Sequence, residues 1–207
     1  MIPKLKICGM KHNTEAVAAL DPDYLGFIFY DKSPRNFEGE PPFQDSVPKK
    51  VGVFVDASLE AISEIVKTHG LDVVQLHGNE SSHFCAQLKN VLSNSEEIWK
   101  VFSVGERFNF EKLDAYELVT NKFLFDTQGA EKGGTGRKFD WTLLENYPSK
   151  KPFILSGGIG PNDAAIITSI LATNLPIYAI DLNSKFETAP GSKDISALKA
   201  FIDELSR

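Results

Sequence analysis

The chain has 207 residues, of which 42% are hydrophobic and 24% charged, and its formal net charge is -6. This length allows one large domain or two small ones. The negative charge argues against a general nucleic-acid binder, which normally shows a basic face. It does not exclude a small anionic ligand, because a few backbone N–H groups can bind phosphate in an acidic protein.

The two cysteines and the start of the chain indicate the cellular compartment of the protein. Cys8 and Cys85 are too few for a disulfide framework or a zinc set, and free thiols suit a reducing compartment. The N-terminus lacks the basic region and apolar run of a signal peptide, and no apolar stretch is long enough to span a bilayer. We therefore expect a cytoplasmic protein with no membrane or nucleic-acid partner.

Short apolar runs alternate with segments of helical spacing along the whole chain. Runs rich in β-branched and aromatic residues predict strands at 4–10, 24–30, 51–55, 73–78, 98–102, 122–126, 153–158 and 177–182. Helical spacing occurs at 13–20, 58–69, 81–91, 110–118, 141–146, 161–171 and 192–205. The Pro-rich segment 38–50 is weakly helical at best.

This alternation predicts an α/β fold with a parallel sheet and the helices outside it. The strand count favours a closed (β/α)8 TIM barrel, a single domain over residues 1–207 in which some outer helices are short or irregular. An open flavodoxin-like or Rossmann sheet is the alternative. However, the first strand lacks the Gly-x-Gly-x-x-Gly turn of dinucleotide-binding proteins.

Polar and small residues gather at the predicted carboxyl ends of the strands, where TIM barrels carry their active sites. They are Cys8, Arg35, Gln75, His77, Asp126, Gly157, Gly158, Asp181 and Asn183. In the first strand, alternation places Lys6 and Cys8 on one face and Ile7 on the other. Positive charge beside Cys8 would lower the pKa of its thiol and favour the thiolate, the form able to act as a base.

Asp126 is the acidic candidate of the sixth strand. Alternation turns Phe123 and Phe125 toward the helices and leaves Asp126 facing the barrel interior. Burial there would favour the protonated acid near neutral pH. A salt bridge with Lys6 or Lys100 is the alternative role for this carboxyl group.

Glycine-rich segments after the seventh and eighth strands predict an anion site. Residues 156–160 precede one helix, and residues 183–184 with 191–192 precede the last. Barrels commonly bind phosphate between these two loops with backbone N–H groups. Segment 133–136 could join this site or act as a lid. No set of His, Cys, Asp and Glu has metal-ligand spacing, so we predict no metal.

A series of short motifs runs from end to end of the chain. They are Lys6-Ile7-Cys8-Gly9-Met10, Gly26-Phe27-Ile28-Phe29 with Lys32-Ser33-Pro34-Arg35, Val51-Gly52-Val53-Phe54, Val74-Gln75-Leu76-His77-Gly78, Phe125-Asp126 with Gly133-Gly134-Thr135-Gly136, Ser156-Gly157-Gly158-Ile159, and Gly191-Ser192-Lys193-Asp194. In this order they resemble the phosphoribosylanthranilate isomerase family, the isomerase barrel of tryptophan biosynthesis. The Lys-Ile-Cys-Gly and Lys-Ser-Pro-Arg motifs are the most specific.

The resemblance implies an Amadori rearrangement of N-(5'-phosphoribosyl)anthranilate to 1-(2-carboxyphenylamino)-1-deoxyribulose 5-phosphate. By similarity, Asp126 is the general acid that protonates the furanose ring oxygen, and Cys8 is the general base that takes the proton from C2'. Arg35 would bind the anthranilate carboxylate with its guanidinium fork. The resemblance implies further substrate contacts from Lys6, Gln75 and His77. It implies phosphate contacts from Gly134, Gly157, Gly158, Asn183 and Ser184. The resemblance implies no cofactor, and it fits a monomer or a homodimer.

One stretch departs from the family pattern, and two alternatives stay open. Ser184-Lys185-Phe186-Glu187 stands where many members have Ser-Gly-Val-Glu, and losing that glycine restricts the backbone around the phosphate. Another phosphosugar barrel would show different strand ends: lysine and glutamate in an indole-glycerol-phosphate synthase, a metal set in a ribulose-phosphate epimerase. A barrel that only binds a phosphorylated ligand is favoured if Cys8 or Asp126 points outward. For His77, a structural hydrogen bond fits as well as a catalytic role.

Overall fold

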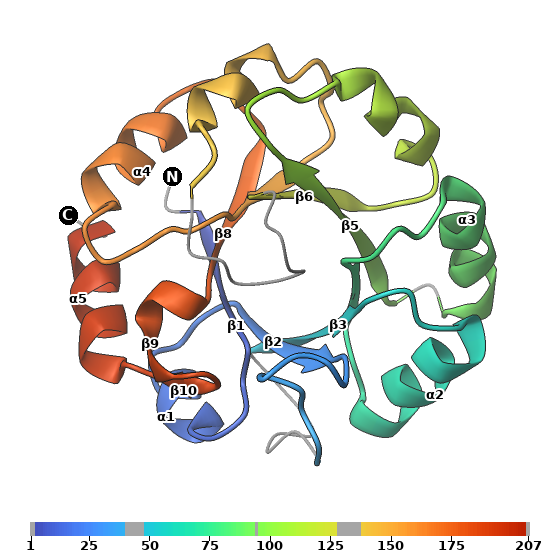
Figure 1. The fold of residues 1–207 in the computed structure, drawn as a ribbon, viewed down its shortest axis with the longest axis horizontal. Coiled ribbons are helices and arrows are strands. Elements are labelled where there is room, and N and C mark those ends of the chain that lie inside the picture. Colours follow the sequence, from blue (N-terminus) through green and yellow to red (C-terminus); the bar gives the residue numbers. More distant parts are fainter. Residues whose placement is uncertain (1–2, 40–47, 94, 128–137, 206–207) are drawn as a thin grey trace.

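The computed structural model describes residues 3–39, 48–93, 95–127 and 138–205, and these form a closed barrel of parallel strands (Figure 1). The strands are β1 (Lys4–Cys8), β2 (Tyr24–Phe29), β3 (Lys49–Phe54), β4 (Val73–Leu76), β5 (Glu97–Val104), β6 (Lys122–Thr127), β7 (Phe153–Leu155) and β8 (Ile177–Leu182). They pair in sequence order, and β1 also pairs with β8 to close the barrel, with Lys6 opposite Asp181. The predicted (β/α)8 fold is confirmed.

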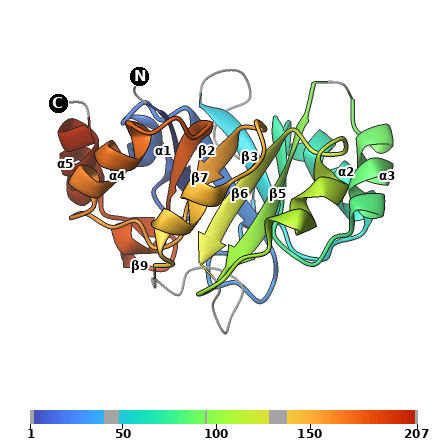
Figure 2. The ribbon, with the colours of Figure 1, turned by 90° about the horizontal axis from the view of Figure 1, so that it is seen from above.

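Helices surround the strands (Figures 1 and 2). The α-helices are α1 (Thr14–Ala18), α2 (Leu59–His69), α3 (Ser82–Val91), α4 (Ala164–Leu171) and α5 (Ile195–Leu205), and the 3-10 helices are η1 (Phe110–Tyr116), η2 (Trp141–Asn146) and η3 (Ser184–Phe186). A small hairpin of β9 (Glu187–Ala189) and β10 (Ser192–Lys193) lies at the end toward which the strands run (Figure 2). Within the described ranges, no helix is long and apolar enough to cross a membrane.

Several predicted boundaries differ from the structure. The last helix begins at Ile195 because Ser192 and Lys193 pair with β9 instead. The helices expected at 110–118 and 141–146 are tighter 3-10 turns. The proline-rich segment ends in β3, whose first residues Lys49 and Lys50 pair with β2, so sheet pairing overrides local composition there. Residues 40–47 of that segment lie outside the described residues.

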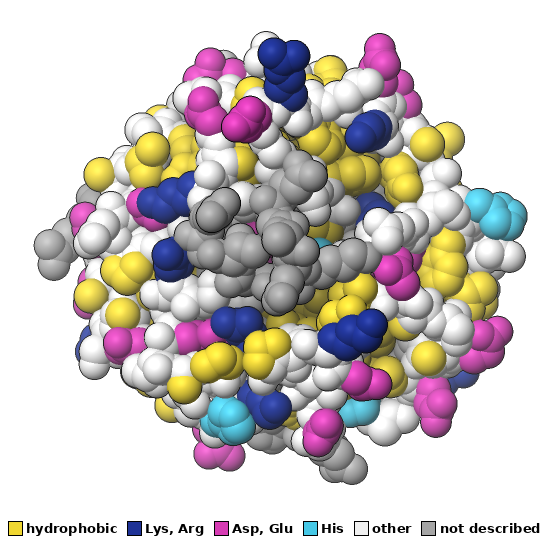
Figure 3. All heavy atoms as spheres, viewed as in Figure 1, with side chains coloured by type: hydrophobic (Ala, Val, Ile, Leu, Met, Phe, Trp, Pro, Cys, Tyr) yellow, Lys and Arg dark blue, Asp and Glu magenta, His cyan; other side chains and the backbone are white. Residues whose placement is uncertain are grey.

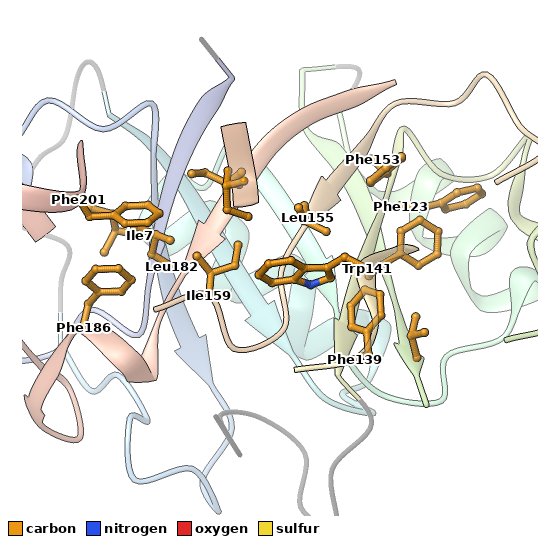
Figure 4. Packing of buried hydrophobic residues seen from close by; sticks show 14 of the residues in the cluster. Ile7, Phe123, Phe139, Trp141, Phe153, Leu155, Ile159, Leu182, Phe186 and Phe201 are labelled. Atoms are coloured by element: carbon orange, nitrogen blue, oxygen red, sulfur yellow. The ribbon is translucent and has the colours of Figure 1, made fainter. Parts of the chain in front are cut away.

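Side-chain alternation sorts the barrel residues into two hydrophobic layers. Leu124 belongs to a cluster within the barrel, whereas Ile7 and Phe123 belong to the cluster between strands and helices (Figure 4). Successive side chains of a strand point to opposite faces. Cys8, next to Ile7, and Asp126, two residues after Leu124, therefore face the barrel interior, as the sequence predicts.

Candidate active site

A buried ion pair lies near the carboxyl end of β1. The Lys6 side chain has no exposed area, and its Nζ donates a 2.9 Å hydrogen bond to Asp181 Oδ1 on β8. Burial disfavours the ammonium, but attraction to Asp181 and Cys8 outweighs it and raises the pKa of Lys6. Lys6 is therefore a fixed cation inside the barrel, within reach of the Cys8 thiol.

Cys8 ends β1 and is 3% exposed. Gly26 on β2 leaves room for its thiol, because a Cβ at that position would lie 2.7 Å from Cys8 Sγ. Burial raises the pKa of the Cys8 thiol, and the ammonium groups of Lys6 and Lys193 offset this only in part. The prediction that nearby cations lower this pKa is wrong in its net direction, because desolvation of the thiolate outweighs their attraction.

Asp126 of β6 and His77, directly after β4, contact each other at the carboxyl ends of the strands, on either side of β5. His77 Nε2 lies 3.4 Å from Asp126 Oδ2, and the two side chains are 16% and 19% exposed. The N–H of Thr127 also donates to Asp126 Oδ1 at 2.8 Å. Lys100 pairs with Glu80 at 3.0 Å, so neither lysine considered as a partner of Asp126 forms an ion pair with it. The contact partner of Asp126 is the histidine at the end of the fourth strand.

Arg35 is engaged by a carboxylate of the chain itself. Its Nε lies 2.9 Å and its Nη2 2.7 Å from Glu187 Oε2, and Nε also reaches Oε1 at 3.0 Å. Burial would raise the pKa of Glu187, but hydrogen bonds from Arg35 and attraction to Lys193 hold it below its usual value. Arg35 Nη1 has no acceptor among the described residues, so this nitrogen can still bind a second anion.

Lys193 and Glu187 are site residues to which the sequence assigned no role. The Lys193 side chain has no exposed area, and its Nζ donates to Glu187 Oε1 at 2.7 Å and to Asn183 Oδ1 at 2.9 Å. A third bond, of 3.3 Å, reaches the Asn183 carbonyl oxygen. Both residues stand in motifs quoted above, but nothing in the sequence shows that β9 and β10 bring them to Arg35.

The loops after β7 and β8 carry the predicted phosphate residues. Gly157 and Gly158 adopt φ values of 92° and 74°, a region that favours glycine, and their N–H groups donate to no acceptor among the described residues. Asn183 and Ser184 begin η3 on the other side. The stem of Lys185 lies beside Gly160, whose added Cβ would be 3.6 Å away, so Lys185 projects toward the loop after β7. Gly134 lies outside the described residues.

Gln75 contributes an unpaired acceptor to the interior. It is 2% exposed on β4, and its Oε1 has no hydrogen-bond partner among the described residues. A buried amide oxygen without a donor is costly, so Oε1 is free to accept a hydrogen bond from a group that enters the barrel. Within the described part of the chain, no group of three or more His, Cys, Asp and Glu side chains is placed to hold a metal ion.

Comparison with known proteins identifies the family of this barrel. Residues 5–204 match the family model for N-(5'-phosphoribosyl)anthranilate (PRA) isomerase. The N-(5'-phosphoribosyl)anthranilate isomerase of Parabacteroides distasonis is 43% identical, over 97% of this chain and 92% of that protein. The crystal structure of the Thermus thermophilus isomerase superposes with a TM-score of 0.80 at 26% identity, covering 98% of each chain.

A further solved structure holds a ligand. It is a phosphoribosyl anthranilate isomerase in complex with reduced 1-(o-carboxyphenylamino)-1-deoxyribulose 5-phosphate, 27% identical with a TM-score of 0.74, covering 99% of this chain and 98% of that one. The family match, the full-length identity and the barrel geometry point the same way. The chain belongs to the phosphoribosylanthranilate isomerase family.

Proposed function

We propose that this protein converts N-(5'-phosphoribosyl)anthranilate into 1-(2-carboxyphenylamino)-1-deoxyribulose 5-phosphate. Family membership supports the reaction, and one observation carries its assignment to residues. Cys8 and Asp126 both face the interior at the same end of the barrel. Among the described residues at the strand ends, Cys8 is the only thiol, and Asp126 is the carboxyl group in contact with a histidine. An alternative barrel that holds a phosphorylated ligand without turnover would not require this pair.

Asp126 is assigned the first proton transfer. As a general acid it protonates the furanose ring oxygen while the C1'–O bond breaks, and the nitrogen lone pair forms the C1'=N bond of the Schiff base. His77, 3.4 Å from Asp126, is assigned to orienting the carboxyl group rather than to contacting the substrate. The 19% exposure of Asp126 leaves it accessible from the mouth, where the sugar ring would enter.

Cys8 is assigned the second proton transfer. Its thiolate removes the proton from C2', and the C2'–H electron pair moves to form the enolamine, neutralising the iminium nitrogen. Loss of the C2' hydroxyl proton and gain of a proton at C1' then give the ketone. The ammonium of Lys6 stabilises the thiolate against the burial that opposes it. We therefore assign Lys6 to the base instead of to the substrate.

The remaining residues are assigned to binding. Nη1 of Arg35 faces the anthranilate carboxylate, and Oε1 of Gln75 accepts a hydrogen bond from a sugar hydroxyl. The phosphate is held by backbone N–H groups of the loops that follow β7 and β8. The proposed residues are Gly157, Gly158, Asn183 and Ser184, with Gly134 as an expected further contact and Lys185 as an added charge at the rim.

The test follows the fluorescence of freshly generated phosphoribosylanthranilate, which turnover quenches. We expect the purified protein to quench it with no added metal and equally after chelator treatment. Cys8→Ala and Asp126→Asn should each lower kcat at least about a hundredfold, the usual loss for a general acid or base. Cys85→Ala is the matched control, because Cys85 is buried on α3 away from the barrel interior.

Three outcomes would count against the proposal. A metal requirement would contradict the acid–base mechanism. Near-normal kcat in either the Cys8 or the Asp126 variant would remove that residue from its assigned role. Binding of the substrate by the wild-type protein without any quenching would favour the non-catalytic barrel.

A further inference from the structure

Lys193 forms the centre of a buried polar cluster that the proposed reaction leaves without a purpose. Its Nζ has three acceptors: Glu187 Oε1, Asn183 Oδ1 and the Asn183 carbonyl oxygen. All three can only accept, and an ammonium carries one proton for each of them. Burial lowers the pKa of Lys193, whereas attraction to Glu187 and the hydrogen bond to it favour the charged form. With its donors occupied by the chain, Lys193 has none left for a ligand and acts through its neighbours.

The charge balance of this cluster depends on Lys193. Glu187 accepts from Arg35 on one side and from Lys193 on the other, and also from the N–H of Gly191 at 3.2 Å. Two cations thus share one carboxylate, which leaves one net positive charge. Without Lys193, the Arg35–Glu187 pair would be neutral, and a neutral pair attracts a second carboxylate far less than a free guanidinium does.

The same cluster lies against the backbone that follows the proposed base. A Cβ at Gly9, directly after Cys8, would be 2.7 Å from Asn183 Oδ1, 2.9 Å from Arg35 Cδ and 3.4 Å from Lys193 Nζ. Gly9 itself has φ of 79°, so the chain turns here onto the cluster. The excess positive charge therefore sits between the proposed base, the proposed carboxylate contact and the loop proposed for the phosphate.

We propose that Lys193 is a positioning residue that sets substrate selectivity: by neutralising Glu187, it leaves Arg35 the positive charge that recognises the substrate carboxylate. This inference rests on the proposed function. A lysine that merely held the hairpin of β9 and β10 in place would affect all substrates alike. A lysine that supplies charge to Arg35 would lower turnover of a substrate that carries the carboxylate, when the lysine is removed, more than turnover of one that lacks it. Its attraction to the Cys8 thiolate acts on both substrates alike and cancels in their ratio.

The experiment compares phosphoribosylanthranilate with phosphoribosylaniline, which lacks the carboxylate. The readout is the ratio of the two kcat/KM values, which a general loss of active protein does not change. Lys193→Met should lower this ratio by at least about tenfold, the size of one charge-assisted hydrogen bond. Lys193→Gln is a second neutral variant that keeps polar contacts, and circular dichroism identifies which variants fold. Lys199→Met, an exposed lysine of α5, is the matched control and should leave the ratio unchanged.

A double variant provides the decisive comparison. Adding Glu187→Gln to Lys193→Met removes one negative and one positive charge, so Arg35 regains its net charge. We expect the ratio to recover most of the loss. Equal loss on both substrates in the Lys193 variants, or no recovery in the double variant, would overturn the inference while the wild-type activity stands. Absence of wild-type turnover of phosphoribosylanthranilate would instead overturn the proposed function.

Discussion

The buried pair of Lys6 and Asp181 allows a quantitative prediction for Asp181→Asn. Lys6 Nζ and Asp181 Oδ1 are 2.9 Å apart, and at an effective dielectric constant of about 20 their attraction is about 6 kcal/mol. Removing one partner of a buried pair typically costs about 3–5 kcal/mol, because the other charge stays buried without compensation. Asparagine keeps an acceptor for Lys6, so we expect a loss near 3 kcal/mol in the free energy of unfolding at pH 7.

Cys8 gives this loss a pH dependence. Asp181 is one of the groups that raise the pKa of Cys8, and Lys6 is the main one that opposes burial. In Asp181→Asn the anion is gone and Lys6 is free to pair with the thiolate, so the pKa of Cys8 falls. As the pH rises through that lowered value, the thiolate replaces the missing carboxylate. The stability deficit should therefore be smaller at pH 9 than at pH 7.

Urea unfolding at both pH values measures this deficit, and alkylation of the folded protein by iodoacetamide measures the thiolate. Adding Cys8→Ser to Asp181→Asn should abolish the recovery of stability at pH 9, because a serine hydroxyl does not ionise at that pH. Asp203→Asn, at an exposed position of α5, is the control and should change stability by less than about 0.5 kcal/mol. A deficit that is independent of pH, or alkylation no faster than in the wild type, would refute the proposed exchange of partners.

Two further substitutions test other parts of the barrel. Burial would raise the pKa of Glu97, but hydrogen bonds from Lys122 and Trp99 hold it below the usual 4.5, so these bonds stabilise the fold above pH 4.5 and are lost as the pH falls through the lowered pKa. Glu97→Gln should therefore lower the free energy of unfolding by about 1–2 kcal/mol at pH 7 and remove this loss of stability in acid, as measured by urea unfolding. An unchanged loss of stability in acid would contradict the assignment. Gly26→Ala would place a methyl group 2.7 Å from Cys8 Sγ, so kcat should fall by about ten- to a hundredfold in the quenching assay. An unchanged kcat would argue against displacement of the thiol.

The sequence was sufficient for the barrel and for the direction of its key side chains. Apolar residues that alternate with polar ones specify faces, because a strand repeats every two residues. Ile7 therefore predicts an inward Cys8, and Phe123 and Phe125 predict an inward Asp126, as the two hydrophobic layers show. The sequence also predicts short outer helices, because the chain is short for a TIM barrel.

Contacts between distant segments could not be read from the sequence. Arg35 and Glu187 are separated by 152 positions, and their pairing depends on a hairpin whose second strand was predicted to be the start of a helix. The pKa direction of Cys8 failed for a related reason. Charges near Cys8 are visible as letters, but the depth of burial that outweighs them follows only from the closed barrel.

The local charge of the mouth explains how an acidic protein can suit an anionic substrate. In Figure 3 several lysine and arginine side chains lie nearer the centre of the view than most of the aspartates and glutamates. Lys6 is balanced by Asp181, but Glu187 faces both Arg35 and Lys193, so these side chains sum to one positive charge. Screening at physiological ionic strength limits the reach of exposed charges to about 8 Å, so the distant acidic residues contribute little there. The net charge of -6 therefore does not oppose binding, because the cluster of Arg35, Lys193 and Glu187 carries a net positive charge.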